Sequence, residues 1–492
     1  NASDTGFTKS NNSIADGSYT ASYYVNDTSN NKNNTASVSF FIDTIVPVPA
    51  YQGATPTTGA NLTITSAFVN VSVTETNGLY GFTNFDNSLT VWYSADNDTS
   101  VDNNTKAYDW SGNNNNATFT NARFNLSGRF AGSLGFDGVG DYATITDSGA
   151  TDELGYDDGG NYTWAGWINP VNNTNRLILA KHACELPSTV PEGVLFNLGA
   201  TGKFCWSEDD GGCSVLQSTT IVSANAWTHW AVTHNTDSDI KLYINGVLES
   251  TYTTGSIADT TVADIRLGST TSYGTGDCTP TDFNGLMDEI LIFNRTLTAD
   301  EINSTYSASA GRFYANYTSL SNGNHTFQSY AVDIAGNRNN TELRIVSVSV
   351  DTTRPNATII FPANRTYGLA NNPLRFNVSL NENGSIKFSL NGGKANVSMI
   401  SEDELSLFGR KFSNESNDSI ADGAYVFSVY ANDTAGNKNY TENITFSIDR
   451  SSPSTITILS PTPEGKNYTT AITAGNPVIF NITVSENVSA TY

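Results

Sequence analysis

The chain has 492 residues, which is too long for one hydrophobic core and predicts three or more domains. Apolar residues make up only 38% of it, enough for strands that need apolar side chains at alternate positions. Its net charge of −24 repels phosphate backbones and anionic lipids, so we expect no nucleic-acid partner. No apolar run is long enough to cross a bilayer, and we expect no transmembrane segment in this chain.

A sequence pattern that first occurs at Ser13 returns twice further along the chain. SIADGSYTASYYVNDTSNNKNNT begins at Ser13, SLSNGNHTFQSYAVDIAGNRNNT at Ser319 and SIADGAYVFSVYANDTAGNKNYT at Ser419. Each copy predicts a turn, an alternating strand, a tight turn and another strand. The repeated Asp of the second turn can accept hydrogen bonds from backbone N–H groups ahead of it, which favours a turn role over calcium ligation. These residues are Asp27, Asp333 and Asp433.

A second repeated half precedes the later copies of the first. The stretch from Arg354 to about Ser389 matches the stretch from Ser452 to Tyr492, and a weaker copy runs from Val46 to about Tyr80. Only the stretch from Arg354 to Asp449 carries both halves side by side, at the usual length of a β-sandwich.

The paired halves resemble immunoglobulin-like modules of archaeal and bacterial surface proteins, which often carry an Asp-x-Ala-Gly-Asn turn. Residues 333–337 and 433–437 fit that turn, and the first copy departs from it at Ser29 and Asn30. The resemblance divides the chain into modules. We expect half a module at 1–45, a split module at 46–88 and 311–352, an insertion at 89–310, an intact module at 353–450 and half a module at 451–492.

The insertion carries three stretches of a different pattern. They are YDWSGNNNNATF with SLGFDGVGDYATI, then WTHWAVTHNTDSDIKLYINGVL, then FNGLMDEILIFNRTLTADEI. Asn245-Gly246 between alternating runs predicts a tight hairpin. Thr298 stands three residues before Glu301, a capping box that predicts the start of a short helix.

Together these stretches resemble the laminin-G-like, concanavalin A-like jelly roll. The predicted fold class is therefore all-β, with tandem immunoglobulin-like β-sandwiches and an inserted laminin-G-like jelly roll. The resemblance implies a structural calcium ion held by loop carboxylates. The matching positions are Asp109 and Asp288, with Asp137 and Asp141 as further candidates.

Four cysteines all lie in the insertion. Cys205 and Cys213 flank an acidic, Gly-rich stretch, which favours a hairpin disulfide between them and leaves Cys184 to pair with Cys278. A zinc site is the alternative, although the spacing is wrong for paired C-x-x-C knuckles.

Two tryptophans of the insertion are candidates for stacking on a sugar. Trp206 and Trp110 sit beside predicted turns and are the candidates for exposed, ligand-binding side chains, whereas the other insertion tryptophans read as core. No nucleophile elbow, His-Glu-x-x-His or P-loop motif occurs, and we expect no enzyme activity.

About thirty Asn-x-Ser/Thr sequons predict an extracellular protein with N-linked glycans. They cover nearly the whole chain, but none lies between Asn172 and Asn294. The sites selected as glycosylation candidates are Asn26, Asn61, Asn125, Asn161, Asn316, Asn377, Asn432 and Asn481.

Two functions fit these observations. The first is a glycosylated structural or adhesive protein of a microbial cell surface, a subunit or repeat unit of a filament, sheath or surface-layer-like array. Its copies would assemble head to tail as a homo-oligomer, or it would be one period of a longer repetitive polypeptide. The second is an adhesin whose jelly roll binds carbohydrate, with the sequon-free interval leaving one face clear.

Overall fold

The computed structural model describes residues 11–485 except 12, 76–77, 97–104, 147–159, 183–192, 209–215, 236–238, 254–263, 270–281, 308–310, 372, 407–408, 416–419, 453–454 and 461–480. The chain is all-β and divides into two compact units, residues 1–349 and 350–492. The described part contains one α-helix, α1 (Ala299–Ser307), and one short 3₁₀ helix, Leu369–Asn371. No helix in that part is long and apolar enough to span a membrane.

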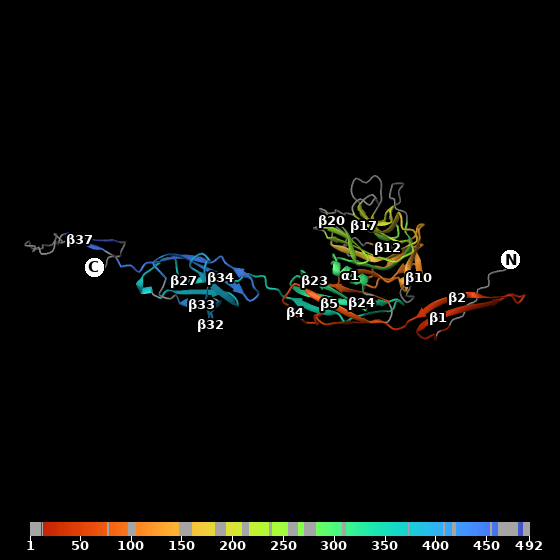
Figure 1. Cartoon of the computed structure of the whole chain (residues 1–492), viewed down its shortest axis with the longest axis horizontal. Helices are drawn as coiled ribbons and strands as arrows, with labels where there is room; N and C mark the ends of the chain where they lie inside the picture. The colour runs from red at the N-terminus through yellow and green to blue at the C-terminus, as the bar shows by residue number, and fades with distance from the viewer. Residues whose placement is uncertain are drawn as a thin grey trace, which may run out of the picture. The chain divides into compact units, whose positions relative to one another are not determined.

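The first unit begins with a two-stranded hairpin of β1 (Gly17–Asn26) and β2 (Lys32–Ile42). It is followed by a β-sandwich whose strands come from both sides of the insertion, and we call it the split sandwich (Figure 1). One of its sheets has the order β23 (Arg312–Tyr317), β5 (Ala67–Thr74), β3 (Val48–Tyr51). The other has the order β25 (Arg338–Asn340), β24 (Gly323–Asp333), β26 (Arg344–Val348), β4 (Asn61–Leu62), with β6 (Leu79–Phe85) also paired to β24.

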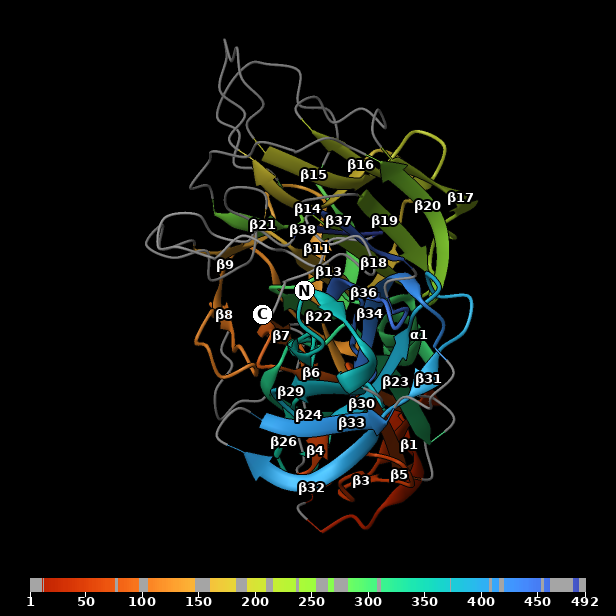
Figure 2. The ribbon, with the colours of Figure 1, turned by 90° about the vertical axis from the view of Figure 1, so that its left-hand side faces the viewer.

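The insertion forms two eight-stranded sheets that enclose the largest core of the protein. The module-facing sheet has the order β10 (Arg123–Phe130), β11 (Gly132–Asp137), β22 (Asn284–Phe293), β13 (Tyr162–Pro170), β18 (Thr228–Asn235), β19 (Asp239–Ile244), β20 (Val247–Thr253), with β7 (Leu89–Tyr93) paired to β22. The outer sheet has the order β17 (Leu216–Ile221), β16 (Lys203–Glu208), β15 (Gly193–Leu198), β14 (Arg176–His182), β21 (Ile265–Leu267), β12 (Tyr142–Ile145), β9 (Ala117–Thr120), β8 (Lys106–Ala107). Figures 1 and 2 show the outer sheet on the side away from the split sandwich.

The central strands of the module-facing sheet are buried on both faces, because the second face of the sheet packs on β6, β24 and α1. Trp167 and Leu291 of this sheet share a core cluster with Phe82 and Val332 of the split sandwich. Strands buried on both faces read as continuous apolar runs, and the segment LTVWY of β7 is buried at every position. The jelly roll and the split sandwich are thus joined by a shared hydrophobic core.

The second unit contains a complete sandwich, residues 357–448, which we call the second sandwich. One sheet has the order β27 (Ala357–Phe361), β29 (Arg375–Leu380), β33 (Gly409–Glu415), β32 (Ile400–Ser406). The other has the order β28 (Thr366–Tyr367), β36 (Asn443–Ile448), β34 (Gly423–Asp433), β30 (Gly384–Ser389), β31 (Val397–Ser398), with β35 (Lys438–Asn439) on β34. A separate hairpin of β37 (Ile456–Ser460) and β38 (Asn481–Val484) follows. That the sandwiches are immunoglobulin-like in particular stays a prediction.

Local sequence signals explain several of these elements. Asn245 and Gly246 form the two-residue turn between β19 and β20, both with positive φ. The Thr298 hydroxyl accepts the Glu301 N–H at 3.3 Å, and the Glu301 carboxylate accepts the Thr298 N–H at 2.9 Å, so the capping box is confirmed.

The repeated turn Asp has its predicted structural role in all three copies. The Oδ1 atom of Asp27 accepts the Asn31 N–H at 2.8 Å, that of Asp333 accepts the Asn337 N–H at 3.0 Å, and Asp433 repeats the contact. Each copy of the repeat therefore forms its own Asx turn.

Candidate functional site

All four predicted calcium ligands accept hydrogen bonds from backbone N–H groups. Asp109 is fully buried, and its carboxylate accepts N–H groups of Trp92, Ser111 and Asn115 at 2.9–3.0 Å. Carboxylate oxygens that hold a turn together in this way have few lone pairs left for a metal. Asp109 is therefore a structural residue of its turn.

Asp288 belongs to a buried acidic cluster that the sequence did not reveal. Its carboxylate accepts the N–H groups of Arg129 at 2.7 Å and Phe130 at 2.9 Å. The neighbouring Glu289 is also fully buried and accepts the Trp92 indole N–H at 2.7 Å, while its Oε1 atom has no hydrogen-bond partner. The only signal in the sequence is the acidic pair inside the apolar run MDEILIF.

Burial raises the pKa values of both carboxyls in this cluster. The pKa of Glu289 is raised to about 8, first by desolvation and then by the charge of Asp96. The pKa of Asp288 rises well above its usual value for the same first reason, with the charge of Glu289 adding to it. Arg338, which pairs with Asp96 at 2.9 Å, is the nearby cation and lowers the pKa of Glu289 only in part.

Asp137 is the last residue of β11, and Asp141, in the loop that follows, directly precedes β12, an interior strand of the outer sheet. Asp141 is buried and accepts the Asp137 N–H at 2.7 Å, while Asp137 is exposed and accepts the Val139 N–H at 2.8 Å. Desolvation raises the pKa of Asp141, and the hydrogen bond from Asp137 opposes this effect. The Gly140 N–H is held by the carboxylate of Asp282, at 2.7 Å.

This loop is part of a compact group of polar side chains, which we call the polar patch: Asp137, Asp141, Tyr142, Arg266, Ser269 and Asp282. The Arg266 guanidinium lies over the Tyr142 ring, 4.3 Å from its centroid. The Ser269 hydroxyl donates to Asp282 at 2.7 Å. Apart from Asp141, each of these residues is partly or fully exposed.

The patch is positioned by the strand alternation of β12 and β21. Ala143 and Leu267 point into the jelly-roll core, so Tyr142 and Arg266 point outward. Gly268 ends β21 with φ of +88°, and a Cβ there would lie 2.7 Å from the Phe136 ring. A glycine is therefore required where the chain turns from β21 toward Ser269.

In the described part of the chain, the four predicted acids do not gather into a metal-sized group. The group of three acids found there is Asp351, Glu382 and Asp433 in the second unit, whose ligand atoms lie within 4.8 Å of one another. Asp433 already accepts the Asn437 backbone N–H and side-chain amide, both at 2.8 Å. Calcium binding by the chain stays a prediction.

The prediction that Trp206 is exposed is wrong. Trp206 is fully buried, with its ring centroid 5.4 Å from that of Trp164. The reason is the register of β16, where Phe204 and Trp206 face the core and Cys205 lies on the opposite face of the strand. A turn next to a strand does not determine which face of the strand each residue occupies.

Trp110 is half-buried, so its predicted exposure is right only in part. The Arg338 guanidinium covers one side of the indole at 3.7 Å, and the Tyr108 ring contacts it edge to face at 5.1 Å. An aromatic ring with a cation on one face has little free surface for a sugar.

Cys205 is disulfide-bonded. Its predicted partner Cys213, like Cys184 and Cys278, lies outside the described residues, so the pairing stays a prediction. The eight selected sequon asparagines are all described, and none is buried: Asn377 and Asn432 are half-buried and the other six are exposed.

Comparison with known proteins supports the jelly roll. Residues 137–303, about a third of the chain, match the family model described as the Concanavalin A-like lectin/glucanases superfamily. The predicted laminin-G-like resemblance of the insertion is thereby confirmed. The search of curated proteins found no match to the chain.

The solved structures that match the chain are distant from it. Domain 4 of AbnA, an extracellular arabinanase from Geobacillus stearothermophilus solved with arabinotriose, is 19% identical over 45% of this chain and 98% of that one, with a TM-score of 0.32. The CBM40 of the Ruminococcus gnavus IT-sialidase, bound to α2,3-sialyllactose, is 14% identical over 35% and 96%, with a TM-score of 0.29. The binding domain of botulinum neurotoxin serotype G is 14% identical over 70% and 72%, with a TM-score of 0.32.

Proposed function

We propose that the chain is a non-catalytic adhesive protein whose jelly roll binds carbohydrate at the polar patch. The observation that carries this proposal is the placement of the jelly roll. One of its sheets is buried against the split sandwich, so the outer sheet is the one whose second face is left for the surroundings. The patch at the ends of its strands β12 and β21 combines hydroxyl, carboxylate, guanidinium and phenol groups, which suit the hydroxyl-rich surface of a sugar.

A glucanase function is less well supported by the same residues. Retaining and inverting glycosidases need two carboxyl groups placed on either side of the scissile bond, one of them free to give and take a proton. In the patch, Asp137, Asp141 and Asp282 each accept a backbone N–H. Such carboxylates are engaged in holding the loop, which favours binding over catalysis.

The binding proposal can be tested with a glycan array followed by calorimetry on any glycan that binds. Arg266→Ala removes the guanidinium and Tyr142→Ala removes the ring beneath it, and each should weaken binding at least about tenfold. Tyr252→Ala is the matched control, because Tyr252 is exposed on β20 of the other sheet. No glycan binding by the wild-type chain, with calcium or with a chelator, would contradict the proposal.

We further propose that the protein is extracellular and N-glycosylated. The accessible sequons and the disulfide-bonded Cys205 support this, because disulfides persist in oxidising compartments. Mass spectrometry of the native protein before and after removal of N-glycans tests it. An unmodified polypeptide mass would contradict it.

The structural role in a filament, sheath or surface array is a second candidate function. It is favoured by the two hairpins, β1–β2 and β37–β38, whose apolar side chains are exposed. Apolar faces of this kind are covered in functional proteins by a partner. Electron microscopy of native material tests this candidate, and dispersed single molecules would count against it.

A further inference from the structure

We infer that the β1–β2 hairpin of one copy and the β37–β38 hairpin of a second copy together complete a β-sandwich. The inference goes beyond carbohydrate binding and does not depend on it. The second sandwich contains both halves in one unit, and each hairpin corresponds to one of them.

The β1–β2 hairpin reproduces the β34–β36 pair of the second sandwich. Gly17 lies opposite Ile42 as Gly423 lies opposite Ile448, and the register is the same along the next five pairs. The Tyr19 and Phe40 rings stack 5.7 Å apart, as Tyr425 and Phe446 do at 5.6 Å in the second sandwich. The hairpin therefore has the conformation of half a sandwich.

The inward face of the β1–β2 hairpin is exposed, whereas the equivalent face of the second sandwich is buried. Tyr23 and Val25 are 56% and 58% exposed, whereas the equivalent Val429 and Ala431 are 1% and 0% exposed. In the second sandwich those positions pack on β27 and β29 of the opposite sheet. The face that lacks a cover is thus the face that the other half of a sandwich would contact.

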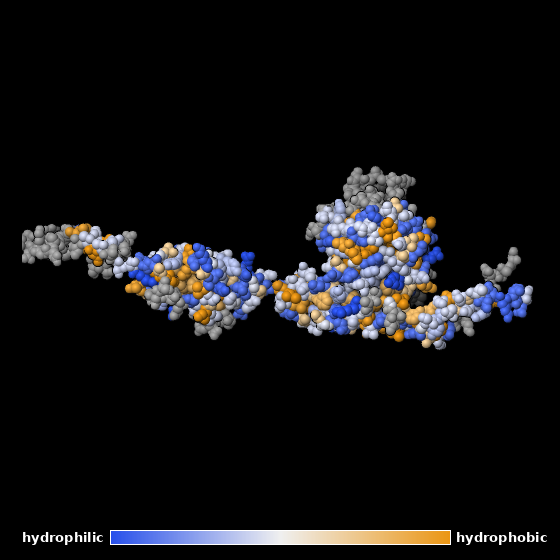
Figure 3. Space-filling view, in the orientation of Figure 1, coloured by the Kyte–Doolittle hydropathy of each residue, from blue (hydrophilic) through white to orange (hydrophobic). Residues whose placement is uncertain are grey.

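The β37–β38 hairpin reproduces that other half. Ile456 pairs with Val484 as Ala357 pairs with Leu380, and both pairs of strands carry a bulge three residues further on. Ile482 is 52% exposed, whereas the equivalent Val378 is fully buried. Figure 3 shows apolar residues at the surface of this hairpin.

The split sandwich and the second sandwich share one hydrogen bond between their halves. The Asn337 amide donates to the Asp43 carbonyl at 3.0 Å, and the Asn437 amide donates to the Asp351 carbonyl at 2.9 Å. Asn31 stands at the same position of the β1–β2 hairpin, and its amide donates to the carboxylate of its own turn Asp, Asp27, at 2.7 Å, as the amides of Asn337 and Asn437 also do within their turns. The equivalent acceptor is the carbonyl of Asp449, before β37.

A second copy of this chain therefore satisfies both the register and the apolar contact of a sandwich.

The experiment measures the oligomeric state of the whole chain by size-exclusion chromatography with light scattering. We expect species at integer multiples of the monomer mass that grow with concentration. Tyr23→Lys places a charge in the interface and should weaken association at least about a hundredfold. Tyr24→Lys is the control, since Tyr24 is 75% exposed and points to the opposite face of β1.

The second hairpin offers an equivalent pair of variants. Ile482→Lys should also block association, whereas Leu459→Lys should not, because Leu459 is 58% exposed and its equivalent Ile360 is 51% exposed in the second sandwich. In a mixture of the two variants, the Tyr23→Lys chain keeps an intact β37–β38 hairpin and the Ile482→Lys chain keeps an intact β1–β2 hairpin. The mixture should form a dimer and nothing larger.

Two results would overturn the inference. A wild-type chain that stays monomeric at its highest soluble concentration would show that a second copy does not cover these faces. A mixture of the two lysine variants that stays monomeric would show that the hairpins do not complement each other. Thermal unfolding of the jelly roll should be unchanged in each variant, and this control distinguishes a lost interface from misfolding.

Discussion

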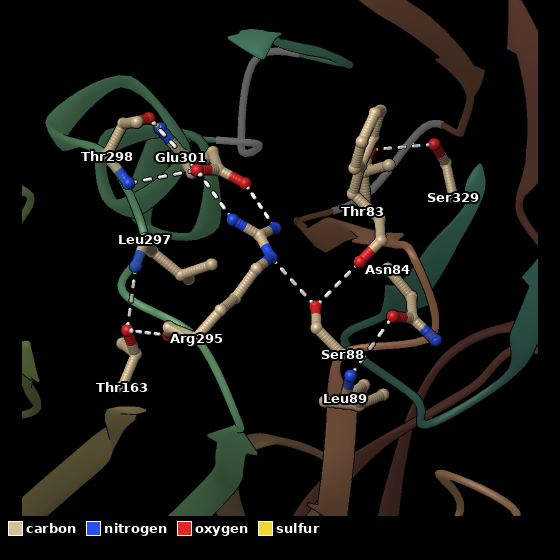
Figure 4. Close-up of polar contacts among 11 residues, drawn as sticks. Thr83, Asn84, Ser88, Leu89, Thr163, Arg295, Leu297, Thr298, Glu301 and Ser329 are labelled. Carbon is tan, nitrogen blue, oxygen red and sulfur yellow. Dashed lines mark hydrogen bonds and ion pairs between the residues drawn. The ribbon is translucent and has the colours of Figure 1, made fainter. Parts of the chain in front are cut away.

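The guanidinium of Arg295 and the carboxylate of Glu301 connect the last strand of the jelly roll to helix α1. Arg295 Nη1 donates to Glu301 Oε2 at 3.1 Å, and its Nε–H donates to the Ser88 hydroxyl at 2.8 Å (Figure 4). Ser88 lies where the chain passes from β6 into β7. The pair therefore ties together both ends of the insertion.

Replacement of Glu301 by alanine should lower the free energy of unfolding by about 2–4 kcal/mol, because it leaves the largely buried Arg295 without its partner. The expected range allows for the part of Arg295 that water still reaches. Urea unfolding measures the change. Asp300→Ala, on the exposed side of the same helix turn, is the control, and an equal loss in both variants would contradict the assigned role.

Trp206→Ala should lower the free energy of unfolding by about 3–5 kcal/mol, because it empties a fully buried position in the jelly-roll core. Calorimetric or denaturant-induced unfolding tests this expectation. A stable variant that has lost only ligand binding would instead favour a surface role for Trp206.

Glu289 should make the protein less stable as pH rises. Its pKa is about 8 in the folded protein and near 4.5 when exposed, so the folded state holds the proton more strongly. The resulting stabilisation is fully present below pH 4.5 and is lost as pH rises toward and through 8. Glu289→Gln should therefore raise the Tm at pH 8.5 relative to the wild type and change it little near pH 4.5.

Thermal unfolding of both proteins across this pH range checks the prediction. The glutamine can still accept the Trp92 indole N–H, so the hydrogen bond is kept while the charge is removed. A variant whose Tm falls by the same amount at every pH would show that packing, not ionisation, dominates at this position.

Asp109→Ala should lower the free energy of unfolding by about 2 kcal/mol or more, because backbone N–H groups of the turn lose their acceptor. If the carboxylate acts only through these hydrogen bonds, calcium should stabilise the wild type and the variant equally. Unfolding with and without calcium makes this comparison. A calcium-dependent Tm increase that is present in the wild type and absent in Asp109→Ala would restore Asp109 as a ligand.

The sequence predicted features that depend on local chemistry. The Asn245-Gly246 turn, the capping box at Thr298 and the Asp27-type turns are each specified within a few residues, and the structure confirms them. The repeated halves were visible for the same reason, because strand alternation and turn residues recur at fixed spacing. The all-β class follows from these signals together.

The sequence failed where the outcome depended on which face of a strand meets which neighbour. Trp206 was assigned to the surface because a turn is near it, but the register of β16 turns it inward. Glu289 was not predicted as a site residue, since only the packing of the jelly roll on the split sandwich buries it without enough countercharge. The polar patch was found in part, through Asp137 and Asp141.

By itself, then, the sequence determined the alternation, the turns, the repeat and the identity of the inserted fold, all of which are set by residues close together in the chain. The tertiary structure decided which acids are buried, which tryptophan is core and which sheet packs on the split sandwich. Those properties arise from contacts between strands hundreds of residues apart, such as β6 with β24, and no local pattern encodes them.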